Sequence, residues 1–398
     1  MLLEILLALF LGILAGILTG LIPGIHNNLI GAFLVSLYAT ILGHIPPIYL
    51  IIFITAMAIS NTFLEFIPSI FLGCPDTDTE LSILPGHRLL KKGLGYQAIT
   101  FTAYGGIIAI FLTLILAWPS IFIMKNIFDE LKLVTPYLLI AVLIFLIYLE
   151  DKKIKAIFVI LITGFLGIII LNFEMKEPLL PLLTGLFGSS MLIASIKDKF
   201  QIPKQTLECE KIKFKDIKRP LLGSLVSSPM CGFLPGLGNG QAAIIGSTIS
   251  KDDEKSFLIL LGATNVFVMA FSFLALYAIS KSRTGAAVAI NEIIGALSSK
   301  MIFLILIVIL ISGIISFILT KKIGKFFSKN ISKINYSKLS IIILCLLVVI
   351  ITAISGWKGL IVLIISTITG IYCISLGVKR TNMMGCLLIP TILFYFGL

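Results

Sequence analysis

Residues 301–319 read MIFLILIVILISGIISFIL, an unbroken apolar run without a charged side chain. Its length matches the roughly 20 residues that an α-helix needs to cross the hydrocarbon core of a bilayer. Similar runs recur along the chain between short polar breaks, and their apolar residues are continuous and do not alternate with polar ones. Because lipid offers the backbone no hydrogen-bond partner, such runs predict membrane-spanning helices.

The composition of the whole chain favours the same interpretation. Of its 398 residues, 58% are hydrophobic and 13% are charged, and the mean hydropathy is +1.12. Soluble domains carry about 25% charged residues, so the composition argues against a soluble multi-domain protein. We predict an all-α integral membrane protein, a polytopic helical bundle with roughly ten or more spans.

The candidate spans differ in length, and several fall short of a full crossing. Short spans are typical of broken or re-entrant helices, whose non-helical backbone is tolerated only inside the protein or beside water. The predicted spans are Leu2–Thr19, Leu29–Leu42, Ile48–Leu72, Ala98–Trp118, Tyr137–Leu149, Ala156–Phe173, Leu180–Ile196, Leu221–Ile249, Phe257–Ile279, Ala286–Leu297, Met301–Leu319, Leu339–Ser355, Leu360–Leu376 and Met384–Leu398.

Basic residues indicate which connections face the cytoplasm. The formal net charge is +12, and Lys and Arg gather in four connections. These connections are residues 150–155, 197–219, 321–338 and 378–380. Two spans separate the first from the second, and two separate the third from the fourth, as cytoplasmic loops require under the positive-inside rule. The connections expected outside are those near His44, Glu174–Glu177 and Trp357. Without a basic soluble domain, nucleic acid is not an expected partner.

The two halves of the chain resemble each other. Residues 20–27 read GLIPGIHN and residues 232–239 read GFLPGLGN; further on, AISNTF at 58–63 pairs with ATNVF at 263–267. Two paired landmarks in the same order indicate an internal duplication. We therefore predict a first transmembrane repeat over residues 1–196, a basic cytoplasmic linker over 197–219 and a second repeat over 220–398, the two repeats being inverted.

The paired Pro-Gly elements are the candidate substrate site. Proline and glycine inside an apolar run break the helical hydrogen-bond ladder, and matching breaks in two halves point to a transporter binding site. Freed amides at a helix N-terminus attract anions. The alternative is a pair of packing kinks whose Asn residues cap the restarted helices. The predicted substrate-binding residues are Pro23, Gly24, Asn27, Asn28, Asn61, Pro235, Gly236, Gly238, Asn239 and Asn265.

A second polar cluster follows the third candidate span. Residues 74–81 read CPDTDTEL, and His87 and Arg88 come soon after. Carboxylate and hydroxyl oxygens suit a hard cation such as sodium, so we predict ion coupling or gating at this cluster. Arg88 is the rival partner for the carboxylates, and a solvated loop with a capping Asp is the structural alternative. The predicted residues are Asp76, Thr77, Asp78, Thr79 and His87.

Other ionisable and reactive residues give weaker signals. Glu65 and Glu292 lie in apolar runs, where ionisable residues are costly and often functional, but each is near a span end and can reach the interface. If the loop with Asp76 and Asp78 is structural, the coupling site is expected at Asn61, Asn265 or Glu65 instead. The six cysteines show no metal-ligand spacing. No GxSxG, HExxH or Walker A motif is present, so we predict no enzyme, no metal site and no ATP-driven transport by this chain alone.

The motifs resemble those of a known family. The Gly-x-x-Pro-Gly-x-x-Asn elements at Gly20 and Gly232 are similar to those of the TctA family, the large permease subunit of tripartite tricarboxylate transporters. Residues 68–90 resemble its archaeal, stand-alone branch. The resemblance implies a two-repeat carrier of organic anions driven by sodium or proton gradients. In the bacterial systems a small membrane subunit and a periplasmic binding protein cooperate with the permease; this chain is shorter, and His26 stands where Gly238 stands in the second motif.

The main interpretation is a secondary, multi-pass carrier of small anionic solutes in the cell membrane. Its expected partners are the solute and the lipid bilayer, and the resemblance adds a small membrane subunit, an extracellular solute-binding protein or a second copy in a homodimer. Apart from a coupling Na⁺ or H⁺, no cofactor is expected. The alternatives are a passive channel and a membrane-embedded enzyme or lipid-handling protein that uses Asp76, Asp78 and His87.

Overall fold

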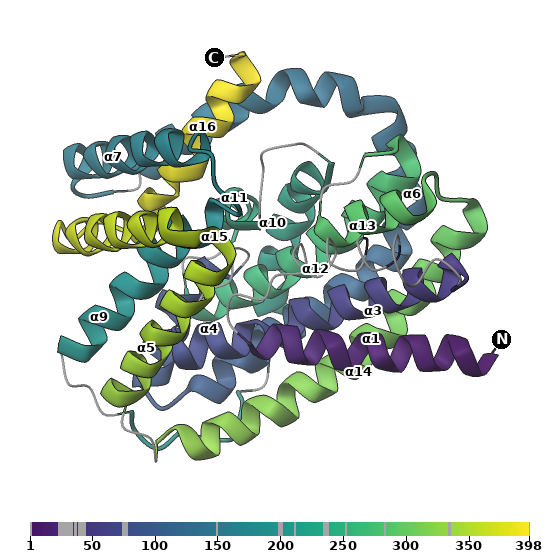
Figure 1. Cartoon of the computed structure of the whole chain (residues 1–398), viewed down its shortest axis with the longest axis horizontal. Helices are drawn as coiled ribbons and strands as arrows, with labels where there is room; N and C mark the ends of the chain where they lie inside the picture. The colour runs from purple at the N-terminus through teal and green to yellow at the C-terminus, as the bar shows by residue number, and fades with distance from the viewer. Residues whose placement is uncertain are drawn as a thin grey trace.

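The chain folds into a bundle of helices in a computed structural model (Figure 1). The structure describes residues 2–22, 35, 38, 45–73, 79–148, 150–197, 202–210, 212–233, 239–250, 253–281, 284–332 and 336–397. Every regular element among them is a helix. The first half contains α1 (Leu2–Leu21), α3 (Pro47–Leu64), α4 (Phe66–Leu72), η2 (Glu80–Ser82), α5 (Ile83–Lys91), α6 (Gly95–Tyr148), α7 (Lys153–Leu171), α8 (Leu179–Leu183), η3 (Thr184–Ser189) and α9 (Ser190–Lys197). The second half contains α10 (Phe214–Phe233), α11 (Asn239–Ser247), α12 (Glu254–Ile279), α13 (Gly285–Ile294), α14 (Ser299–Ile331), α15 (Tyr336–Ser375), η4 (Arg380–Met384) and α16 (Gly385–Phe396).

Seven stretches of helix among the described residues are long and apolar enough to cross a membrane, and three shorter apolar stretches accompany them. Large apolar side chains point outward from several of these helices, among them Leu3 (80% exposed) and Ile154 (84%). Apolar faces of this extent are suited to lipid and not to water. The prediction of an all-α, polytopic membrane protein is therefore confirmed. The predicted span Leu29–Leu42 lies outside the described residues, apart from Val35 and Tyr38.

Two spans form the centre of the bundle. In the continuous stretch of α3 and α4, and again in α12, 94% of the most apolar segment is buried, against 28–44% in the other five spans. Helix α1 packs on α3 and α10 packs on α12, so each central helix has a partner from its own half. Each also has a partner from the other half, because α14 packs on α3 and α6 packs on α12.

Small residues allow these helices to approach closely. A Cβ atom added to Gly12 or Gly16 of α1 would collide with the backbone oxygen of Phe53 or Met57 on α3. Between α6 and α12 the collision is reciprocal: Gly105 faces the carbonyl oxygen of Ile259, and Gly262 faces that of Thr102. Small residues are enriched where membrane helices pack, because packing and not water exclusion holds them together.

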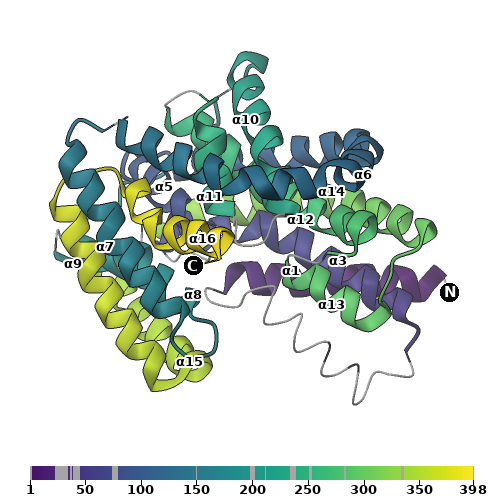
Figure 2. The same ribbon diagram turned by 90° about the horizontal axis from the view of Figure 1, so that it is seen from above.

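A second group of helices lies to one side of this centre. Figures 1 and 2 show α7, α9 and α15 together at one end of the molecule, with α1 and the N-terminus at the other. Within the group, α15 packs on η3 and α9, and α16 packs on α7. The π-helical turn η3 (Thr184–Ser189) is fully buried in this contact. The two groups meet through the contact of α16 with α6.

One predicted separation between spans is wrong, and another is confirmed. The spans predicted at Ala98–Trp118 and Tyr137–Leu149 belong to one helix, α6, which contains two prolines. The intervening sequence KNIFDELK (125–132) is rich in good helix formers, and neighbouring helices let membrane helices tolerate proline. The spans predicted at Leu339–Ser355 and Leu360–Leu376 lie on either side of Gly356, whose non-helical backbone (φ 67°, ψ −163°) divides α15 into two helices, so this separation is confirmed. Within the predicted span Leu221–Ile249, α10 ends at Phe233 and α11 begins at Asn239.

The described part of the linker is fastened to the first half. The backbone N–H of Thr206 donates to the carbonyl of Gly93 (2.8 Å), and the side chain of Gln205 donates to the carbonyl of Leu90 (3.1 Å) and accepts from the N–H of Gly95 (2.8 Å). The linker was predicted over residues 197–219. Its last residues are helical, because α10 begins at Phe214. The linker thus covers the turn between α5 and α6.

Candidate functional site

A buried polar network joins the two halves at the centre of the bundle. The side-chain amide of Asn265 on α12 donates from Nδ2 to the carbonyl of Thr62 (3.2 Å) and to Oε1 of Glu65. Asn239, the first residue of α11, donates from its own Nδ2 to Oδ1 of Asn265 (2.5 Å). Glu65 is 4% exposed, Asn265 1% and Asn239 7%. Side chains from three helices therefore share one enclosed polar site.

The first half contributes a related contact. Asn61 on α3 donates from Nδ2 to Oγ1 of Thr19 on α1 (3.1 Å), and the Thr19 hydroxyl donates to the carbonyl of Gly16 (3.2 Å). The neighbouring Ser60 accepts a hydrogen bond from Ser316 of α14 (2.9 Å), which links the halves a second time. Asn61 on α3 thus bonds to α1, and Asn265 on α12 bonds to α3. In each case the bonded helix packs against the helix that carries the asparagine.

Local backbone geometry places Glu65 at this site. Glu65 forms the joint between α3 and α4, where its N–H still donates to the carbonyl of Asn61 (3.0 Å) and its carbonyl accepts a longer bond from Ser69 (3.4 Å). One helical turn thus separates Asn61 from Glu65. Gly73, in the left-handed conformation (φ 66°, ψ 24°), then ends α4, since glycine adopts this conformation without strain.

Thr79 and His87 lie in a separate packed hairpin on α4. The hydroxyls of Thr79 and Ser69 are 2.5 Å apart, and the Ser82 hydroxyl donates to the carbonyl of Thr79 (2.7 Å). Nδ1 of His87 lies 2.9 Å from the carbonyl of Ile70. Burial lowers the pKa of His87 to about 4, so its imidazole is neutral at physiological pH and Nδ1 carries the proton of this bond. These hydrogen bonds hold η2 and α5 against α4.

Some of the predicted site residues are therefore among the described residues, and others are not. It brings Asn239 and Asn265 together, and it places Asn61 one turn from Glu65. Whether Thr79 and His87 couple ions remains a prediction. Ten predicted residues lie outside the described residues: Pro23, Gly24, Asn27, Asn28, Asp76, Thr77, Asp78, Pro235, Gly236 and Gly238.

Glu65 is the central residue that the sequence named only as an alternative coupling residue and not among the predicted site residues. Its position near the end of a candidate span suggested a side chain that reaches the interface, whereas the structure buries it between helices. A signal was present in the repeat: aligning Asn61 with Asn265 places Glu65 opposite Met269. A carboxylate at only one of two corresponding apolar positions is hard to explain by packing.

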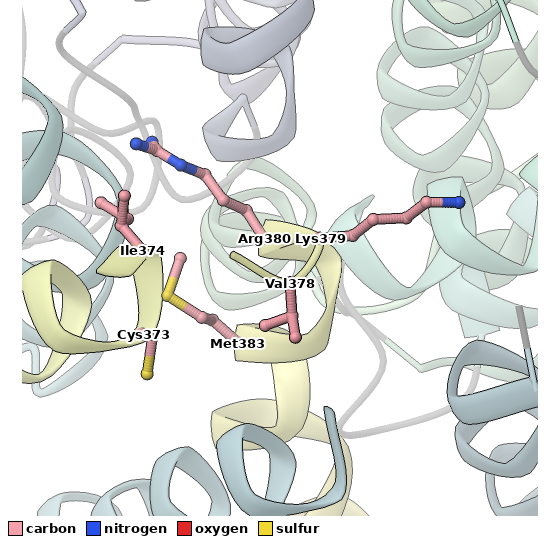
Figure 3. Close-up of a pocket in the computed structure, with 6 residues that line it drawn as sticks. All are labelled: Cys373, Ile374, Val378, Lys379, Arg380 and Met383. Carbon is pink, nitrogen blue, oxygen red and sulfur yellow. The ribbon is translucent and has the colours of Figure 1, made fainter. Parts of the chain in front are cut away.

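Outside this network, a small hollow lies at the turn between α15 and η4 (Figure 3). It is lined by Cys373, Ile374, Val378, Lys379, Arg380 and Met383, it is partly open to solvent, and its enclosed volume is about 0 Å³. Sites for drug-sized ligands usually enclose roughly 300–1,000 Å³, so the hollow is too small for an organic substrate. Figure 3 shows the side chains of Lys379 and Arg380 extending in opposite directions from the turn. In the part of the chain that the structure describes, no group of three or more His, Cys, Asp or Glu is placed to hold a metal ion.

Comparison with known proteins identifies relatives along nearly the whole chain. A family model described as "Tripartite tricarboxylate transporter TctA family" matches residues 6–385. An uncharacterized protein of the archaeon Methanocaldococcus jannaschii is 33% identical over 387 residues, covering 93% of each chain. No solved structure matches the chain. The matched region contains both Pro-Gly elements and every residue of the buried network.

Proposed function

Because the chain belongs to the TctA family of tripartite tricarboxylate transporters, we propose that it is a secondary carrier of small organic anions, such as carboxylates, in the cell membrane. The observation that carries this proposal is the buried contact of Asn265 and Asn239 from the second half with Glu65 from the first. Polar groups in a membrane interior are costly and mark substrate or ion pathways. A site shared by two halves suits a carrier that works by moving one half against the other.

The inverted repeat supplies the mechanism of this proposal. The Pro23-Gly24 and Pro235-Gly236 elements lie outside the described residues; in this proposal they are the sequence positions at which helix breaks would free backbone amides for the carboxylates of the substrate. The contact pairs support it: α1 on α3 corresponds to α10 on α12, and α14 on α3 corresponds to α6 on α12. An ion gradient provides the energy, since the sequence has no Walker A motif.

The partners of the carrier form a further part of the proposal. The bacterial systems that the motifs resemble work with a small membrane subunit and a binding protein, whereas the resemblance of residues 68–90 to the archaeal branch favours a stand-alone carrier. A membrane-embedded enzyme is not favoured by any contact described. His87, which such an enzyme would use with Asp76 and Asp78, is buried against a backbone carbonyl.

Uptake by the purified protein tests the proposal. Protein reconstituted alone in liposomes is expected to accumulate radiolabelled citrate or malate under an inward sodium or proton gradient. Asn265→Ala removes the donor to Glu65 and Thr62 and should lower the initial rate about tenfold or more, the equivalent of one lost hydrogen bond to a charged group. Asn126→Ala is the matched control, because Asn126 is exposed and bonds only its own helix in the contacts seen.

Two further variants address the helix breaks. Gly24→Leu or Gly236→Leu fills the space in which the substrate carboxylates would meet the backbone and should abolish uptake while the protein remains folded, as judged by gel filtration. No uptake of any di- or tricarboxylate by the wild-type protein, under either gradient, would overturn the proposed function.

A further inference from the structure

We propose that Lys152 and Lys379 bind the phosphate of an anionic phospholipid whose acyl chains lie on the outward faces of α7 and α15. The inference goes beyond the proposed function, because it assigns a lipid site and does not depend on the solute that is carried. Two basic connections that are far apart in the sequence, residues 150–155 and 378–380, meet at this place.

The hydrogen bonds of Glu150 bring the two lysines to one surface. The Glu150 carboxylate accepts from the backbone N–H of Lys379 (2.8 Å) and from the side chain of Asn382 (2.9 Å). Lys152, two residues after Glu150, extends over the turn that follows α15, where its Nζ lies 3.1 Å from the position of a Cβ atom added to Gly377. Gly377 is two residues from Lys379, so both lysines belong to the contact between these two connections.

The exposed charge of this surface is mainly positive. The two connections contain five Lys or Arg residues and two acidic residues. One of the acidic residues, Glu150, is 7% exposed and its carboxylate bonds within the contact, whereas the side chains of Lys152 and Lys379 are exposed. Basic side chains at the cytoplasmic end of membrane helices attract the headgroups of anionic lipids, so the phosphate of such a lipid complements this surface.

Aromatic side chains beside the lysines indicate the level of the membrane interface. Tyr148, at the end of α6, is 71% exposed, and the ammonium group of Lys153 lies 5.2 Å from the centre of its ring. Phe158 of α7 and Tyr372 of α15 are both exposed and pack edge to face, with their ring centres 6.2 Å apart. Exposed tyrosines are typical of the headgroup level of a bilayer, where a lipid phosphate lies.

Beyond these rings, α7 and α15 present apolar faces on which acyl chains can lie. Side chains three or four residues apart share one face of a helix. The exposed apolar residues at this spacing are Phe158, Leu161 and Phe165 on α7 and Ile361, Ile364 and Ile368 on α15. Because Phe158 contacts Tyr372, the two faces are adjacent near the lysines. One phospholipid can therefore meet apolar side chains with its chains and the two lysines with its phosphate.

Native mass spectrometry of the purified full-length protein in detergent tests the site. The affinity for phosphatidylglycerol is compared with that for phosphatidylcholine of the same acyl chains, which has no net charge. Phosphatidylglycerol should bind roughly tenfold or more tightly, because each Lys near an anionic headgroup contributes about fivefold in affinity. Lys152→Gln/Lys379→Gln should remove this preference, and Lys152→Arg/Lys379→Arg should keep it.

Lys325→Gln/Lys329→Gln is the matched control. These exposed lysines of α14 belong to the third basic connection, so the variant loses the same charge on the same predicted side of the membrane and should keep the preference. Equal losses in the two glutamine variants, or no preference in the wild type, would overturn the site. Displacement of phosphatidylglycerol by an equal concentration of inorganic phosphate would instead show a site for free anions. Spectra of two chains without retained lipid would assign the faces to a second copy, and either result would refute the lipid site.

Discussion

Single side chains in this protein owe their chemistry to the elements around them. The imidazole of His87 belongs to a short helix with Arg88 and Lys91 nearby, which in water would be an ordinary basic segment. Folding buries His87 under α4, and its pKa falls to about 4 through burial, assisted by the charges of Lys91 and Arg380. Burial beside Arg88 likewise lowers the pKa of Arg380 to about 10. The lowered pKa values of His87 and Arg380 therefore could not be predicted from the residue types alone.

Protonation of His87 should destabilise the fold. The pKa is about 6.5 in the unfolded chain and about 4 in the folded one, so the unfolded state binds more protons between these values. Stability is then complete above about pH 6.5 and is lost as pH falls toward 4, by an amount on the order of 3 kcal/mol. Unfolding midpoints in detergent from pH 7 to pH 4 measure this loss.

The matched variant for this prediction is His87→Gln. Glutamine can still donate to the carbonyl of Ile70 but does not titrate, so its midpoint should depend less on pH over this interval than that of the wild type. Equal pH dependence in both proteins would show that His87 is not the group responsible.

Contacts between elements depend on a few small residues. The contact of α6 with α12 joins the first half to the second, and it relies on Gly105 and Gly262, each facing a backbone carbonyl of the other helix. The same arrangement recurs where Gly16 of α1 meets α3. Each central helix can therefore approach its neighbour, α12 on α6 and α3 on α1, at backbone distance.

Gly262→Ala should separate α6 from α12. The added methyl group collides with the carbonyl of Thr102, a backbone atom that cannot rotate away, and overpacking of this kind costs roughly 1–3 kcal/mol. A lower unfolding midpoint and slower carboxylate uptake are expected together. Phe111→Ala, on the half-exposed face of α6, is the control and should change the midpoint much less; equal effects would argue against the glycine contact.

At the scale of the whole molecule, loops that were predicted to lie on the same side of the membrane contact each other. Glu150, in the first basic connection, accepts from the N–H of Lys379 (2.8 Å) and from Asn382 (2.9 Å) at the fourth. At another place Lys358, beside Trp357, donates to the carbonyl of Glu174 (2.9 Å). Connections that the charge pattern assigns to the same side of the membrane are thus in contact. This agreement supports the predicted grouping of the loops into two sides.

Cysteine labelling tests the predicted orientation. In a background without the six native cysteines, Lys152→Cys and Lys379→Cys should react with an impermeant maleimide only from the cytoplasmic side, and Trp357→Cys only from outside. The reason is the positive-inside rule, which retains Lys- and Arg-rich loops in the cytoplasm. Labelling of positions 152 and 357 from the same side of sealed vesicles would show the topology to be wrong.

An all-α membrane protein with paired landmarks could be predicted from local features of the chain. Runs such as residues 301–319 predict helices because the bilayer acts on local composition, and every backbone group must be bonded within the segment. The resemblance to the TctA family was also readable from local motifs, and the family match confirms it. Helix continuity was less predictable: α6 runs through two prolines because the helices around it stabilise the interrupted turns.

Which polar residues meet depends on the packing of helices that are distant in sequence. Asn265 and Glu65 are 200 positions apart, and no local pattern relates them. Their contact arises because α12 and α3 pack in the centre of the bundle, where both side chains are buried. In such a place a polar side chain must find a partner from whichever helix is nearest, so the partner is chosen by packing and not by spacing along the chain.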